Sequence, residues 1–136
     1  MPRSREARLY YQAAKQRFLD AELLLKYERT TGAVYLAGYT AECFLKALIL
    51  ASVAGRLRGD LLGEFRGVRG HSIEWLGAIY RRHVTTAIPR EVTRHLVHLA
   101  EWSTDLRYET GTMRSRDADG FIRSVIAVAA WADGRM

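Results

Sequence analysis

Residues 38–47 read GYTAECFLKA, an apolar run in which Glu42 and Lys46 are the only charges. Residues four apart lie on one face of an α-helix, and glutamate before lysine is the favourable order for an ion pair. The small residues Ala37, Gly38 and Ala41 allow another backbone to approach closely at this level, so unpaired charges here would be costly. We therefore predict a structural ion pair at the rim of a helix contact.

The flanking segments predict a helical hairpin. Apolar residues recur at spacings of three and four from Ser4 to about Glu28, which is the pattern of a long amphipathic helix. Thr30 and Thr31 are N-cap candidates for a second helix that continues without proline to about Val53. A short turn between two long helices predicts antiparallel packing.

The rest of the chain predicts three further helices. Gly55–Gly70 reads GRLRGDLLGEFRGVRG, which indicates a mobile basic loop with one helical turn at Leu61–Phe65. A cap at His71-Ser72 opens a third helix that ends near Arg82, and Pro89 fits the first turn of a fourth. After a polar, turn-rich segment, apolar spacing predicts a last helix from Phe121 to about Ala130. We expect an all-α bundle of about five helices in one domain, residues 1–136.

Composition and charge limit the partners and the cellular compartment that we expect. The formal charge of +6, from 21 basic and 15 acidic residues, mildly favours polyanionic partners, although a solvated arginine-rich surface explains the same number. Cys43 is the single cysteine and no N-terminal leader is recognisable, so we expect a cytoplasmic protein without disulfides. The longest apolar stretch, Phe44 to Ala54, is interrupted by Lys46 and is too short to span a bilayer, which predicts no membrane segment.

Side chains for ligand binding are basic and aromatic. His95 and His98 are three residues apart but lack further ligands, so we expect no metal and no cofactor. No glycine-rich phosphate loop occurs, so any phosphate would be held by loop groups. The candidates for nucleotide or RNA binding are Arg66, Arg69, His71, Arg107, Tyr108, Arg114 and Arg116. Bases could stack on Tyr35, Tyr39, Trp75, Trp102 or Tyr108, although aromatic residues at helical spacing also build cores.

Four motifs together resemble the HEPN domains, a family of small all-α domains. AVYLAGYT followed by AECFLKALI resembles their second-helix signature through Ala41, Glu42, Leu45 and Lys46, and residues 17–25, RFLDAELLL, resemble the end of their first helix. His71-Ser72 with Leu76 resembles the start of their third helix, and Leu106-Arg107-Tyr108 a later arginine-tyrosine step. The resemblance runs in order from about Ala7 to Ala130.

The resemblance implies a homodimer that binds a nucleotide or RNA, or that partners a small nucleotidyltransferase in a toxin–antitoxin-like pair. Many HEPN proteins are metal-independent ribonucleases that use an arginine and a histidine four to six residues apart. Arg90 and His95 have that spacing, as do Arg66 and His71, but the family's pair normally falls near Arg107, and no histidine follows His98. The pattern therefore favours a non-catalytic binding module, and a ribonuclease using Arg90 and His95 or a helical adaptor without ligand are the alternatives.

Overall fold

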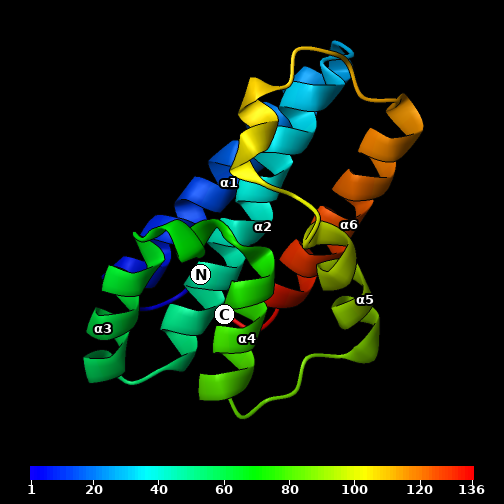
Figure 1. Cartoon of the computed structure of the whole chain (residues 1–136). Helices are drawn as coiled ribbons and strands as arrows, with labels where there is room; N and C mark the ends of the chain where they lie inside the picture. The colour runs from blue at the N-terminus through cyan, green and yellow to red at the C-terminus, as the bar shows by residue number, and fades with distance from the viewer.

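The protein is a bundle of six α-helices and two short 3-10 helices, in a computed structural model that describes residues 1–136 (Figure 1). The all-α prediction is confirmed, with one helix more than expected. In chain order the elements are α1 (Arg5–Lys26), α2 (Thr30–Ser52), α3 (Gly55–Phe65), η1 (Val68–His71), α4 (Ile73–His83), α5 (Arg90–Leu99), η2 (Thr104–Tyr108) and α6 (Ser115–Asp133).

Helices α1 and α2 form the predicted antiparallel hairpin and make the largest contact between any two elements (Figure 1). The side chain of Ser4 caps α1 by accepting a hydrogen bond from the Ala7 amide at 3.2 Å. Small residues on the buried face of α1, including Ala14 and Ala21, let the two helices approach closely. The turn between them places Glu28 at a φ of 60°, in the left-handed region.

The predicted caps of α2 have a different role. Arg29 occupies the N-cap position and makes no side-chain cap bond. Thr30 Oγ1 instead donates to the carbonyl of Met113 at 2.7 Å, and Thr31 Oγ1 donates to the carbonyl of Gly111 at 2.8 Å. The threonine hydroxyls therefore act as hydrogen-bond donors to backbone carbonyls of the polar segment before α6. Residues near these carbonyls in the sequence do not provide such donors. We call residues 103–114 the strap, because these bonds fasten its end to the start of α2.

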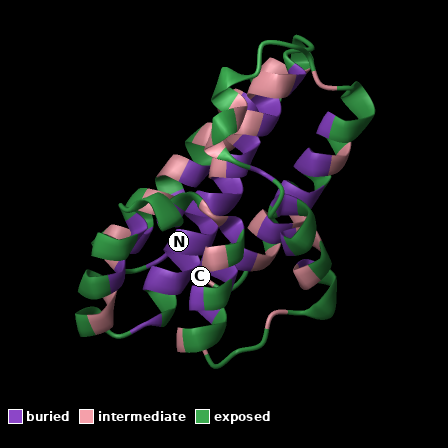
Figure 2. Ribbon diagram, viewed as in Figure 1, coloured by how far each residue is buried: buried purple, intermediate pink, exposed green.

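Helix α2 is the centre of the core, with α1, α4 and α6 packed around it (Figure 2). Its 23 residues, with a mean hydropathy of 1.4 over the most apolar window, are long and apolar enough to cross a membrane. This corrects the expectation that the apolar stretch is too short. However, 78% of that window is buried inside the bundle, and core helices of soluble proteins meet the same criterion.

Residues 55–65 form helix α3, where a loop with a single helical turn at Leu61–Phe65 was predicted. Gly55, Gly59 and Gly63 lie four apart and face open space, and Gly59 in the helix interior costs about 1 kcal/mol relative to alanine. Leu61 and Phe65 are only 2% and 1% exposed, and burial of each contributes roughly 1.5–3 kcal/mol. Burial of this apolar face offsets the cost of Gly59. A prediction based on glycine content alone does not take that burial into account.

The later helices follow the prediction except at the starts of α5 and α6. Ser72 caps α4 as predicted, accepting from the Trp75 amide at 3.1 Å. Pro89 is the N-cap of α5 rather than a residue of its first turn. Helix α6 begins at Ser115 and not at Phe121, because its first turns are polar and mostly exposed and so carry no apolar pattern.

Candidate functional site

The predicted pair on α2 is present, but it lies in the core rather than at a rim. Lys46 Nζ lies 2.6 Å from Glu42 Oε1, and the two side chains are only 4% and 3% exposed. At this depth both ions have lost their water, so the small stabilisation of an exposed helix pair does not apply. A pair this deeply buried depends on satisfying every remaining hydrogen-bonding position.

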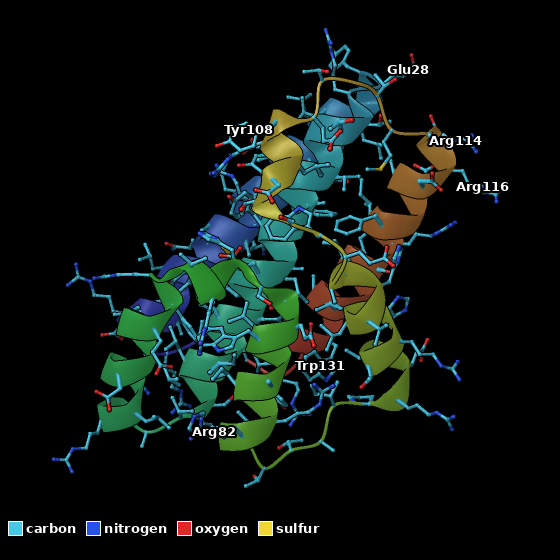
Figure 3. The ribbon with its side chains drawn as sticks, in the orientation of Figure 1. Glu28, Arg82, Tyr108, Arg114, Arg116 and Trp131 are labelled. Carbon is cyan, nitrogen blue, oxygen red and sulfur yellow. The ribbon has the colours of Figure 1, made fainter.

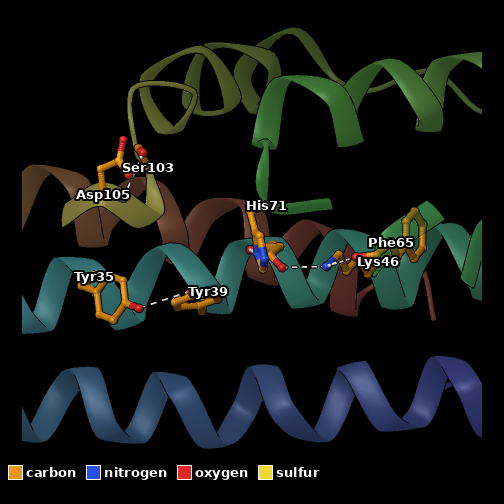
Figure 4. A network of polar contacts seen from close by, with 8 residues as sticks. Tyr35, Tyr39, Lys46, Phe65, His71, Ser103 and Asp105 are labelled. Atoms are coloured by element: carbon orange, nitrogen blue, oxygen red, sulfur yellow. Dashed lines mark hydrogen bonds and ion pairs between the residues drawn. The ribbon is translucent and has the colours of Figure 1, made fainter. Parts of the chain in front are cut away.

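The neighbours of the pair provide those partners (Figure 4). Lys46 Nζ also donates to the carbonyl of Phe65 at 3.2 Å and lies 5.3 Å from the ring centroid of Tyr10. The second carboxylate oxygen of Glu42 lies 3.2 Å from His71 Nδ1. The imidazole is 45% exposed. The network therefore joins α2 to the α3–η1 segment and reaches the surface at His71.

Gly70 allows η1 to fold against α3. A Cβ at this position would lie 2.0 Å from the carbonyl oxygen of Phe65, so only glycine fits. This close approach brings the next residue, His71, over α2 and against Glu42. The glycine-rich sequence that first indicated a loop thus includes a residue that builds the network.

An aromatic row continues from His71 along α2 (Figure 4). The Tyr39 ring centroid is 6.0 Å from that of His71 and 5.0 Å from that of Trp102, and its hydroxyl is 3.3 Å from that of Tyr35. Burial raises the pKa of Tyr39, and the bond to Tyr35 adds to the effect. A Cβ on Gly38 would lie 2.0 Å from the indole of Trp102. A side chain therefore fills the space at Gly38, where a backbone was expected.

Arg107 and Tyr108 of η2 extend this row into solvent. The Arg107 guanidinium lies 4.8 Å from the Tyr108 ring centroid, and Tyr108 is 70% exposed. The pKa of Arg107 is raised by its interaction with Tyr108 and, to a lesser extent, with Tyr35. We call Tyr35, Tyr39, His71, Arg107 and Tyr108 the aromatic strip.

The other predicted binding arginines do not join the strip. Arg66 lines a shallow groove with Arg8 on α1, and Arg69 lines another with Arg82 on α4. Arg114 is the N-cap of α6, at the far end of the strap (Figure 3). Of the predicted set, His71 thus lies beside Tyr39, and Arg107 lies over the ring of Tyr108.

Arg90 and His95 do not converge within one chain. Five positions along a helix correspond to a rotation of about 140°, which puts the two side chains on different faces of α5. His95 Nδ1 contacts the buried hydroxyl of Ser124 at 3.0 Å, and His98 Nδ1 contacts it at 2.8 Å. No group of three or more His, Cys, Asp or Glu side chains is placed to hold a metal ion.

A cleft of about 620 Å³ lies between the strap, α2 and α6. Sequence reasoning missed it, because its walls come from segments that are distant in the chain. Its lining includes two of the predicted binding candidates, Trp102 and Arg116, and also His98. Its lining is Val34, His98, Glu101, Trp102, Ser103, Asp105, Leu106, Glu109, Met113, Arg116, Asp117, Gly120, Phe121 and Arg123.

Comparisons of the chain with protein-family models, with curated proteins and with solved structures each find no match.

Proposed function

We propose that the protein is a non-catalytic, HEPN-like module that binds single-stranded RNA along the aromatic strip. The observation that carries the proposal is the exposed Tyr108 ring held against Arg107 on η2, an element that packs against α2, where the rings of Tyr35 and Tyr39 are half-buried. Unpaired bases stack on such rings, and a guanidinium beside them pairs with phosphate. The HEPN resemblance independently suggests the same class of ligand.

The arrangement favours single strands over duplexes. Stacking on an aromatic side chain is worth about 1–3 kcal/mol per base, and it requires a base that is free of its own stack. The chain's net charge of +6 adds a salt-dependent attraction for either form. Tighter binding of single-stranded RNA than of the duplex would therefore indicate binding at the strip. Affinity for RNA alone would not, because the net charge attracts both forms.

The test is fluorescence anisotropy with a fluorescein-labelled ten-nucleotide single-stranded RNA and the duplex of the same sequence. Tyr108→Ala is expected to weaken single-strand binding roughly tenfold, and Arg107→Ala to weaken it and flatten its salt dependence. Matched controls are Tyr27→Ala, at a tyrosine that is 67% exposed, and Arg56→Ala, at an exposed arginine on α3. If the controls weaken binding as much as the strip variants, or the duplex binds as well, the strip is not the site.

We propose further that the module is a homodimer. Leu9, Leu19 and Leu23 of α1 and Ile126 of α6 are each about half exposed or more, and Leu19 and Ile126 line one groove. Burying such side chains favours association. Light scattering after size exclusion should report a dimer that Leu19→Lys with Ile126→Lys converts to a monomer. Val68→Lys, at a valine that is 91% exposed, is the control; a monomeric wild type would exclude the dimer.

A further inference from the structure

The cleft under the strap has an apolar floor. Val34, Trp102 and Phe121 are buried side chains that line it, and Leu106 and Met113 are partly buried beside them. Hydrogen bonds to Thr30 and Thr31 hold the end of the strap at the start of α2. The cleft lies between the strap so held, α2 and α6.

The rim of the cleft carries charges that the protein leaves unpaired. The ion pairs of the chain are Arg17 with Asp20, Glu42 with Lys46, and Glu42 with His71. No charge of the rim is among them, so none lies within 4.0 Å of an opposite charge. Four carboxylates face two guanidiniums, which gives the rim a net charge of −2 with His98 neutral, in a chain of net charge +6. The rim residues are Glu101, Asp105, Glu109, Asp117, Arg116 and Arg123.

One residue that lines the cleft, Trp102, carries a buried hydrogen-bond donor. The indole Nε1 of Trp102 is inaccessible to solvent and has no hydrogen-bond partner, although the residue is 7% exposed and lines the cleft. An unpaired buried donor is unfavourable, and a ligand that supplies an acceptor would remove that cost. This observation is independent of the charges on the rim.

We infer that the cleft binds an extended basic peptide segment of a protein partner. Arginine or lysine side chains of the peptide pair with the rim carboxylates, and their aliphatic stems lie on the apolar floor. A peptide carbonyl accepts the hydrogen bond from Trp102 Nε1 once the indole shifts enough to uncover this atom, which is buried against Gly38 before binding. Nucleotide phosphates fit the site poorly, because carboxylates outnumber guanidiniums. The overall positive charge opposes binding only weakly, because salt screens charges that are more than about 10 Å apart.

The test uses a fluorescein-labelled hexapeptide that alternates arginine and alanine and is blocked at both ends. Anisotropy is measured without RNA, so the result does not depend on the aromatic strip. Saturable binding below about 1 mM is expected. Asp105→Asn with Asp117→Asn should weaken it roughly 2- to 30-fold, the range for two exposed ion pairs. The control is Glu22→Gln with Asp60→Asn, the same change of charge on α1 and α3.

A second variant tests the hydrogen bond. Trp102→Phe keeps a large ring over Gly38 and removes only the N–H, so binding should weaken about two- to tenfold. If this variant does not fold, the rim variants still decide the question. Three results would overturn the inference: no saturable binding, equal weakening by the control, or displacement of the peptide by spermine at equal total charge, since spermine has no carbonyl acceptor.

Discussion

Removing the ammonium group of the core ion pair should destabilise the protein severely. Lys46→Met keeps an unbranched apolar side chain but leaves Glu42 buried, with only His71 as a partner. Breaking a buried pair in this way costs about 3–5 kcal/mol. The carbonyl of Phe65 also loses the lysine donor, at a cost of about 1–3 kcal/mol. We therefore expect a loss of at least about 4 kcal/mol, a large part of the 5–15 kcal/mol typical of a domain.

A double-mutant cycle isolates the pair. Glu42→Leu with Lys46→Met removes both charges at similar volume, so it should be more stable than Lys46→Met alone, with a coupling energy of about 3 kcal/mol. Urea unfolding followed by far-ultraviolet circular dichroism gives each free energy. The reasoning fails if Lys46→Met loses less than about 1 kcal/mol, or if the costs of the single changes simply add.

Three further changes test other parts of the structure, each by urea unfolding. Gly38→Ala puts a Cβ 2.0 Å from the Trp102 ring, so it should cost about 1–3 kcal/mol and shift tryptophan emission; unchanged emission would mean the ring does not lie there. Burial raises the pKa of the Cys43 thiol to about 12. Because the unfolded thiol ionises near 8.5, its contribution is intact below that pH and falls as pH rises, by about 2 kcal/mol at pH 10; Cys43→Ala should lack this loss. Glu28→Gly should stabilise by about 0.5–1 kcal/mol by relieving the φ of 60°, whereas Glu28→Ala should not.

The hairpin and the ion pair could be predicted because both follow from local spacing. Apolar periodicity predicts α1 and α2, and the i, i+4 relation predicts contact between Glu42 and Lys46. The depth of the pair could not be predicted, because it depends on Phe65 and His71, which arrive from α3 and η1. Their arrival depends on residues 55–65 being helical, where the sequence indicated a loop.

The aromatic strip and the cleft also differ in how far local sequence spacing predicts them. All five residues of the strip were candidates by residue type, but local spacing relates only two of them, Tyr35 and Tyr39, which lie on one helix ridge. The cleft depends on the threonine bonds that hold the strap to α2, and on Asp105 and Asp117 facing the same opening from separate elements. No spacing rule relates such residues, because their proximity is created only by tertiary packing.

Trp102 connects the strip and the cleft. On one side its ring centroid is 5.0 Å from that of Tyr39, and on the other the residue lines the cleft. A peptide carbonyl bound to Nε1 would fix the orientation of the ring against Tyr39, so a peptide in the cleft should change the affinity of the strip for RNA. By linkage, bound RNA should change the affinity of the cleft for the peptide by the same factor. Gly38→Ala should weaken both ligands because it displaces the shared ring, whereas Asp105→Asn should weaken the peptide alone. If Gly38→Ala leaves RNA binding unchanged, the two surfaces are independent.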